Sequence, residues 1–203
     1  RGGLADLGLD EDVGLDHAWP SFRSIRPRPV IACPGPSPGC PGLNATLPVM
    51  PRSPQPLVAD LTEAQLLDRL LPLLAIGEPE RVGPGDDAAV LDLPGAAVVT
   101  TDTLVRDIDW RDDWSTPEDV AVKAVVQNLA DLAAMGARPR SLLLSLVLDR
   151  HTTVEWVTRF AAQFGQECRR YAVSAAGGDL SSAPDESRVI AVTAIGVLDG
   201  RDP

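Results

Sequence analysis

From residue 58 onward, the sequence predicts an α/β domain, in which helices and strands follow one another along the chain. Helix-capping patterns introduce three segments with apolar residues at helical spacing. Runs rich in Val, Ile, Leu and Thr lie between and after them, as is typical of strands. Aromatic residues make up only 4% of the chain, so we expect a core built mainly from Leu, Val, Ile and Ala.

The chain before residue 58 has a different composition. Eleven of the nineteen prolines fall within residues 1–57. Proline removes a backbone donor and blocks both helix interiors and central strands. We therefore interpret residues 1–57 as a disordered extension or, because the first methionine is Met50, as a misassigned start. Residues 58–203 then form the folded domain.

The first predicted helix begins at a capping box, residues 62–65, and continues through leucines at helical spacing. Pro72 falls inside this pattern and is expected to bend or end the helix. Two short β-type runs follow, Ala88 to Leu93 and Ala97 to Thr101, joined by a turn at Pro94-Gly95.

The clearest helical signal comes next. Thr116 stands at the N-cap, Pro117 at the first helical position and Gly136 just past the end. This combination predicts a helix of about five turns between residues 117 and 135.

The last third of the domain alternates between the two kinds of element. An apolar strand is predicted from Ser141 to Asp149, and Thr152 is the expected N-cap of a helix that ends near Tyr171. A short strand is possible near Val173. The final β-type run spans Arg188 to Leu198.

Charge and composition exclude several classes of function. The net charge of −11 disfavours nucleic acid as a partner, since a phosphate backbone is bound by clustered Lys and Arg. No run approaches the roughly 18 apolar residues of a membrane helix, and no secretory signal is visible. Cys33, Cys40 and Cys168 match neither a disulfide framework nor a zinc pattern. We expect a soluble cytoplasmic protein with free thiols.

Acidic residues recur where elements are expected to end. They lie in Gly85-Asp86-Asp87, in Thr100-Thr101-Asp102 and in Gly177-Gly178-Asp179, and a further carboxylate, Asp131, lies inside the strong helix. Each motif taken singly also fits ordinary turn or helix-surface chemistry. Together they favour a magnesium site, because magnesium prefers carboxylate and hydroxyl oxygens and lets substrate phosphates complete its shell. We expect these carboxylates to converge in space.

The same motifs, in this order, resemble thiamine-monophosphate kinases of the aminoimidazole-ribonucleotide synthetase-like superfamily. The similarity runs from about residue 60 to the end of the chain, and its most specific part is the long string within the strong helix. The strings that carry it are Gly85-Asp86-Asp87-Ala88-Ala89-Val90, Thr100-Thr101-Asp102-Thr103-Leu104-Val105, the run from Asn128 to Pro139, and Gly177-Gly178-Asp179.

The resemblance implies a fold, a reaction and a site. The fold is the amino-terminal domain of that superfamily, with a mixed sheet and helices on one face. The reaction is transfer of the γ-phosphoryl group of ATP to thiamine monophosphate, with several Mg²⁺ ions and no catalytic nucleophile in the protein. A homodimer that shares a barrel is also implied. The implied metal ligands are Asp87, Thr100, Thr101, Asp102, Asp131 and Asp179, with Gly178 and Asp179 against ATP and Asp109 against the substrate.

Two departures accompany the resemblance. Asp109 stands where the family usually has a histidine, and the family continues beyond residue 203 into a second domain, so we expect this chain to correspond to the first domain only. Two alternatives remain open. One is another ATP-dependent enzyme of the superfamily, such as a hydrogenase-maturation enzyme or selenophosphate synthetase, and the other is a non-catalytic module that binds divalent cations.

Overall fold

The computed structural model describes residues 55–74, 77, 80–84, 86–184 and 186–200, with the backbone only at residues 80 and 81. Most of the predicted disordered extension, residues 1–57, therefore lies outside the described residues. Its last residues join the domain: Val154 N donates to Pro56 O, and Leu57 forms a bridge with Thr153.

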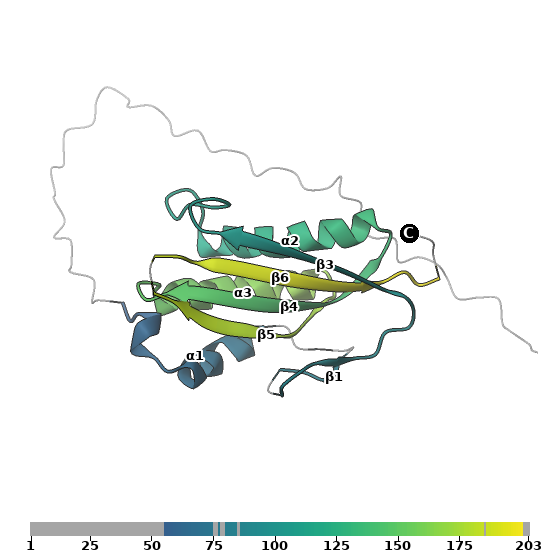
Figure 1. Cartoon of the computed structure of the whole chain (residues 1–203), viewed down its shortest axis with the longest axis horizontal. Helices are drawn as coiled ribbons and strands as arrows, with labels where there is room; N and C mark the ends of the chain where they lie inside the picture. Colours follow the sequence, from purple (N-terminus) through teal and green to yellow (C-terminus); the bar gives the residue numbers. More distant parts are fainter. Residues whose placement is uncertain (1–54, 75–76, 78–79, 85, 185, 201–203) are drawn as a thin grey trace, which may run out of the picture. The chain divides into compact units, whose positions relative to one another are not determined.

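A four-stranded mixed sheet forms the centre of the domain, as the sequence-based resemblance implied (Figure 1). Its strands are β3 (Ala97–Val105), β4 (Arg138–Asp149), β5 (Ser174–Ala183) and β6 (Val189–Val197), in the order β3-β6-β4-β5. The pairs β3/β6 and β4/β6 are antiparallel, whereas β4/β5 is parallel. Strands β3 and β5 are consequently the two edges of this sheet.

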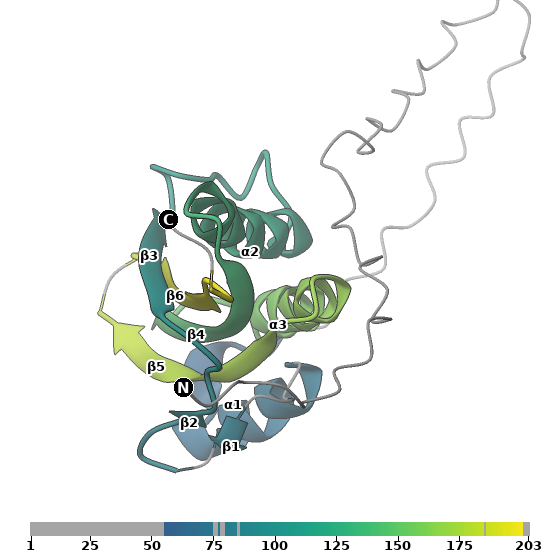
Figure 2. The same ribbon diagram turned by 90° about the vertical axis from the view of Figure 1, so that its right-hand side faces the viewer.

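Two helices, α2 (Pro117–Ala134) and α3 (Val154–Arg170), lie side by side on one face of the sheet (Figure 2). The start and end signals of α2 are confirmed. Thr116 accepts a hydrogen bond from Asp119 N, and Gly136 has φ +67°, a conformation that glycine adopts at little cost. The predicted cap of α3 is wrong by one residue. Thr153, not Thr152, accepts from Trp156 N.

The core lies between this helix pair and the sheet. Alternate residues of the strands point into it, and the largest fully buried side chains include Phe160 and Phe164 of α3 and Leu142 of β4. The aliphatic core expected from composition is confirmed, since most buried side chains are Leu, Val, Ile and Ala.

Helix α1 (Glu63–Leu70) begins at the predicted capping box, in which Gln65 N donates to Thr62 Oγ1. The α-helical part ends before Pro72, and the chain continues as the short 3₁₀ helix η3 (Leu71–Leu73), because proline cannot supply the backbone donor that a longer helix needs. A second 3₁₀ helix, η2 (Val58–Asp60), precedes α1.

The region between α1 and β3 differs from the expected pair of joined strands. Strand β2 (Val90–Leu91) pairs with β1 (Glu80–Val82), which was not predicted, and β3 pairs with β6 along its whole length. The turn at Pro94-Gly95 therefore separates two sheets. Strand β3 also continues four residues beyond the predicted end at Thr101.

The strand suspected near Val173 is the ten-residue strand β5. Its sequence is rich in Ala, Gly and Ser, which have low strand propensity, so local pattern could not reveal its length. Pairing with β4 over nine residue pairs stabilises it instead. Among the helices described here, none combines the length and the apolar character required to cross a bilayer.

Candidate functional site

One group of predicted ligands lies between strand β3 and helix α2. Thr100 Oγ1 donates a hydrogen bond of 3.2 Å to Asp131 Oδ2. Asp102 is two residues further along β3, and because side chains alternate along a strand it points to the same, helix-covered face as Thr100. Asp131 is exposed and Asp102 is half-buried, so both carboxylates can be reached from solvent. This group offers two carboxylates and a hydroxyl, the hard oxygen donors that magnesium prefers.

Thr101 points to the opposite, open face of the sheet for the same reason. Its hydroxyl donates to Val192 O at 3.1 Å and accepts from Thr193 Oγ1 at 3.1 Å. The three residues of the Thr-Thr-Asp motif therefore do not form one cluster. They were expected at the end of a strand, but they lie in the interior of β3, where alternation separates them.

A second group of acidic residues borders a cavity of about 770 Å³ beside β5. Asp86, Asp87 and Asp179 all line it, together with apolar residues of α1, β4 and β6. Asp179 was expected in a loop, yet it lies within β5, where Ser181 Oγ donates to its Oδ2 at 2.8 Å. Asp87 N donates to Asp86 Oδ1 at 3.0 Å, which fixes the turn that carries both carboxylates. Gly85, the first residue of this motif, lies outside the described residues.

Gly178 has a structural reason to be glycine. A Cβ atom at this position would lie 1.7 Å from Leu144 O and 2.6 Å from Leu144 C, so strands β5 and β4 could not approach as they do. Gly177, by contrast, would meet nothing closer than Leu143 Cδ2 at 3.7 Å. Gly178 therefore allows the close pairing of β5 with β4. This structural role is separate from the contact with ATP that the resemblance implies.

The two acidic groups lie on opposite faces of the sheet and at opposite edges. Three interstrand spacings separate β3 from β5, which amounts to roughly 14 Å. Within the residues described, no group of three or more His, Cys, Asp or Glu side chains is arranged to hold a metal ion. The expected convergence of all four aspartates is thus not observed within a single chain. Their role as metal ligands stays a prediction.

Asp109, the candidate substrate contact, lies in the loop between β3 and α2. Its Oδ2 accepts from Val105 N at 2.8 Å, so the carboxylate closes its own loop. Lys123 of α2, the only lysine of the chain, donates from Nζ to Asp109 O at 2.6 Å. Sequence reasoning missed Lys123, although a single lysine among seventeen arginines was a visible signal.

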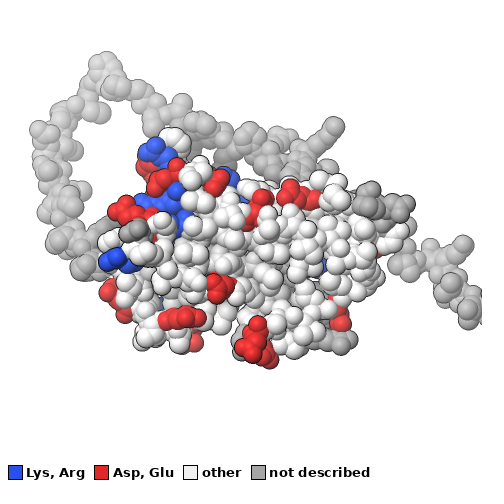
Figure 3. Space-filling model, in the orientation of Figure 1, with Lys and Arg blue, Asp and Glu red and all other residues white. Residues whose placement is uncertain are grey.

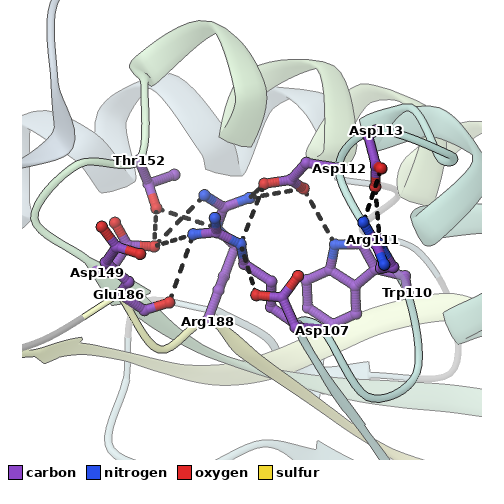
Figure 4. A network of polar contacts seen from close by, with 10 residues as sticks. Asp107, Trp110, Arg111, Asp112, Asp113, Asp149, Thr152, Glu186 and Arg188 are labelled. Atoms are coloured by element: carbon purple, nitrogen blue, oxygen red, sulfur yellow. Dashed lines mark hydrogen bonds and ion pairs between the residues drawn. The ribbon is translucent and has the colours of Figure 1, made fainter.

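A buried polar network beside the same loop was also missed (Figure 4). Its centre is Arg188, whose side chain is 5% exposed and lies 4.2 Å over the ring of Trp156. Arg188 Nε donates to Thr152 Oγ1 at 3.0 Å, and its Nη2 lies 3.4 Å from Oδ2 of the fully buried Asp149. The partners are 36 to 39 residues apart in sequence, so no local pattern could have found them.

Burial and charge act against each other in this network. Burial lowers the pKa of Arg188, while the nearby Asp112 and Asp149 carboxylates favour its charged form. Burial by itself would raise the pKa of Asp149. Hydrogen bonds from Thr152 Oγ1 and His151 N, together with Arg188 and Arg106, outweigh that effect and lower the pKa below its ordinary value. The lowered pKa favours the ionised form of Asp149 although its side chain is buried.

Comparison with known proteins identifies the protein family of this chain. The model of the family described as "AIR synthase related protein, N-terminal domain" matches residues 85–198. This chain belongs to that family. The match includes every predicted ligand from Asp87 to Asp179, and the superfamily inferred from the sequence is thereby confirmed.

Individual proteins of related sequence or structure add detail. The chain is 49% identical over 122 residues to the thiamine-monophosphate kinase of Corynebacterium glutamicum. The matched stretch covers 59% of this chain and 36% of that protein. A solved thiamine-monophosphate kinase from Stenotrophomonas maltophilia is 31% identical with a TM-score of 0.52, covering 66% of this chain and 40% of that one. A solved hydrogenase maturation protein HypE is 28% identical with a TM-score of 0.50, covering 56% and 34%. The AIR synthase related domain therefore spans well under half the length of these relatives.

Proposed function

We propose that this protein transfers the γ-phosphoryl group of ATP to thiamine monophosphate and so forms thiamine diphosphate. The observation that carries the proposal is the 49% identity to a thiamine-monophosphate kinase over 122 residues. The hydrogenase maturation proteins share the fold at lower identity, 28% for the HypE that was solved in complex with ATP. ATP is therefore the proposed phosphoryl donor whether the protein is a thiamine-monophosphate kinase or a relative of the hydrogenase maturation proteins.

Mg²⁺ is the proposed cofactor, because all the candidate ligands are hard oxygen donors. Thr100, Asp102 and Asp131 would hold metal on the helix side of β3, and Thr101, Asp87 and Asp179 on the open side. When bound, magnesium neutralises phosphate charge and orients the reacting oxygens. The protein's own part is to hold these carboxylates at fixed positions on rigid elements, which the Thr100–Asp131 hydrogen bond favours. No protein nucleophile is required, since the attacking phosphate oxygen is already ionised.

The cavity bordered by Asp86, Asp87 and Asp179 is the proposed place for ATP. Its volume of about 770 Å³ falls within the range of small-molecule sites, roughly 300 to 1,000 Å³. Its lining is mostly apolar around Leu143, Ala176 and Ile195, with Asp179 and the adjacent Gly178 at one side. An apolar wall suits a nucleotide base, whereas the acidic side suits a magnesium-bound phosphate chain. Asp109 is the proposed contact for thiamine monophosphate.

We further propose that the protein acts as a homodimer in which the two acidic groups come together. Within the described part of the chain, strands β3 and β5 are the edges of the sheet, and proteins commonly cover such edges. The open face between them carries few charges over its middle (Figure 3), and Val99 on β3 is 61% exposed. If β5 of a second copy lay along β3 with its open face turned to the helix-covered side of the first sheet, its Asp179 would approach Asp102 across the interface.

The proposed location is the cytoplasm, where thiamine monophosphate and ATP are both available and where free cysteines remain reduced. Cys168 is a free, buried cysteine, in agreement with this proposal.

An assay with ATP, thiamine monophosphate and Mg²⁺ tests the proposed reaction in the protein at its natural length. We expect thiamine diphosphate to form only when all three are present. ATP turnover that needs a different acceptor would favour another enzyme of the superfamily, such as one that acts in hydrogenase maturation. Calorimetry addresses the third possibility. ATP binding that requires magnesium supports the kinase, while cation binding indifferent to nucleotide would favour a cation-binding module.

A further inference from the structure

The loop that follows β3 has a conformation that needs external support. Asp107 has φ +65°, a left-handed conformation that is strained for a residue with a Cβ atom, although aspartate tolerates it better than most residues. Local hydrogen bonds partly offset that strain: Asp107 N donates to Trp110 O at 2.7 Å, Asp109 N donates to Val105 O at 2.8 Å, and Val105 N donates to Asp109 Oδ2 at 2.8 Å. The bonds to Val105 join the loop to the end of β3.

Asp112 connects this loop to the rest of the domain. Its Oδ1 accepts from Nε1 of the buried Trp110 at 3.2 Å and lies 3.3 Å from Arg188 Nη1. Its Oδ2 lies 3.2 Å from Arg106 Nε. Arg188 also accepts from Arg106 N through its backbone carbonyl at 2.9 Å. Arg188 and Asp112 therefore fix both ends of the loop segment Arg106–Trp110.

Ionic contacts replace close packing on this side of the loop. A cavity of about 300 Å³ lies beside it, lined by Arg106, Asp112, His151, Thr153, Trp156, Glu186 and Arg188. Nε of Arg106 is buried without a well-aligned hydrogen bond in the described chain, although Asp112 lies 3.2 Å from it and Arg106 Nη1 lies 3.7 Å from Asp149. If the pair of Arg188 with Asp112 were lost, the loop would have room to shift into this space.

We propose that Arg188, acting through Asp112, is a positioning residue that holds the Arg106–Trp110 loop, and with it Asp109, where the phosphate-accepting substrate is bound. This inference rests on the proposed function, which makes Asp109 the substrate contact. Neither Arg188 nor Asp112 touches the reacting atoms. They act by fixing the loop on its cavity side, where Arg106 also contacts Asp149 and Glu186 O, and Lys123 holds the same loop from the side of α2.

The test compares Asp112→Asn with a matched control at the opposite end of the sheet. Asp112 is 36% exposed, so the neutral isostere is expected to fold, and its amide oxygen can still accept from Trp110. The control is Arg138→Met, which removes a two-bond ion pair with Asp199, at 2.6 and 2.9 Å. Arg188→Lys serves as a second variant, since it keeps the charge but loses the fork of the guanidinium.

Two readouts separate this inference from the proposed function. In Asp112→Asn and Arg188→Lys, the amides of Arg106, Asp107 and Asp109 should exchange hydrogen at least about tenfold faster, as expected when a charge-assisted contact is lost. The KM for thiamine monophosphate should rise about tenfold for the same reason, while the KM for ATP changes less than about twofold. Arg138→Met should change neither quantity.

Each other outcome has a definite meaning. Unchanged exchange in both variants overturns the positioning role, whatever the activity. Faster exchange with an unchanged KM for thiamine monophosphate also overturns it, while the proposed function stands. If the Arg138→Met control showed the same faster exchange and the same rise in the KM for thiamine monophosphate, the effect would be a general one of ion-pair removal, and the result would count against the inference. If the unmodified protein forms no thiamine diphosphate, the proposed function fails, and the substrate role of this loop fails with it.

Discussion

Thr100 Oγ1 on β3 donates a 3.2 Å hydrogen bond to Asp131 Oδ2 on α2, and this contact links two motifs that are 31 residues apart in sequence. It holds the Asp131 carboxylate against the face of β3 that also carries Asp102. Because the hydrogen bond leaves further lone pairs on the Asp131 carboxylate, the group can still accept from or coordinate another partner.

The first prediction concerns these carboxylates. In the protein at its natural length, Asp102→Asn and Asp131→Asn should each lower kcat roughly 100-fold or more, since metal-held phosphate charge contributes several kcal/mol to catalysis. Neither change should lower the melting temperature appreciably, because neither side chain is buried. Asp68→Asn, on the exposed surface of α1, is the matched control. Near-normal turnover in both variants would rule out their proposed role.

The second prediction compares the two neighbouring glycines of β5. Gly178→Ala places a Cβ against the Leu144 backbone and should destabilise the fold by about 1–3 kcal/mol, as other overpacked positions do. Gly177→Ala meets only ordinary contacts and should be tolerated. Thermal unfolding of the two variants measures the difference. Equal melting temperatures would show that the strands can adjust, and the structural explanation of Gly178 would be wrong.

The sequence predicted local features well and long-range features poorly. The boundaries of α2 followed from Thr116 and Gly136, because caps depend on residues close together in the chain. The pairing of β5 could not be predicted, since Ala, Gly and Ser carry almost no strand signal and the strand depends on β4. The family motifs identified candidate ligands, but they gave no information on which side of the sheet each residue faces.

Some of that missing information was accessible in principle. Alternation along β3 places Thr100 and Asp102 on one face and Thr101 on the other, once the motif is recognised as strand interior. The predicted β-type run ended at Thr101, so the motif fell at its end rather than in the interior of a strand. The Arg188–Asp112 contact, by contrast, joins residues 76 apart and depends entirely on tertiary structure.

The third prediction concerns acid stability. Because the pKa of Asp149 is lowered in the folded state, its ionised form stabilises the protein. This contribution is fully present above the ordinary aspartate pKa, about 3.9, and is lost as the pH falls through the lower, folded-state value. The difference in unfolding free energy between the unmodified protein and Asp149→Asn should therefore stay constant from pH 6 to about pH 5 and shrink as the pH falls below about 4. Urea denaturation at several pH values measures it, and a difference independent of pH would contradict the prediction.

The fourth prediction concerns Cys168. Burial raises the pKa of its thiol to about 12, so very little thiolate exists at pH 8. In a Cys33→Ser/Cys40→Ser variant, which leaves Cys168 as the only thiol, a thiol reagent should react slowly with the native protein and rapidly after denaturation. Rapid labelling of the native variant would mean that this part of α3 opens readily.

The most direct test mixes two inactive variants of the natural-length protein, Asp102→Asn and Asp179→Asn, under conditions that allow subunits to exchange. If each site combines Asp102 of one copy with Asp179 of the other, a mixed dimer holds one intact site and one doubly altered site. A 1:1 mixture should then recover about a quarter of normal thiamine diphosphate formation, since half of the symmetric dimers are mixed. If the mixture is no more active than either variant alone, the two acidic groups do not meet across a dimer interface.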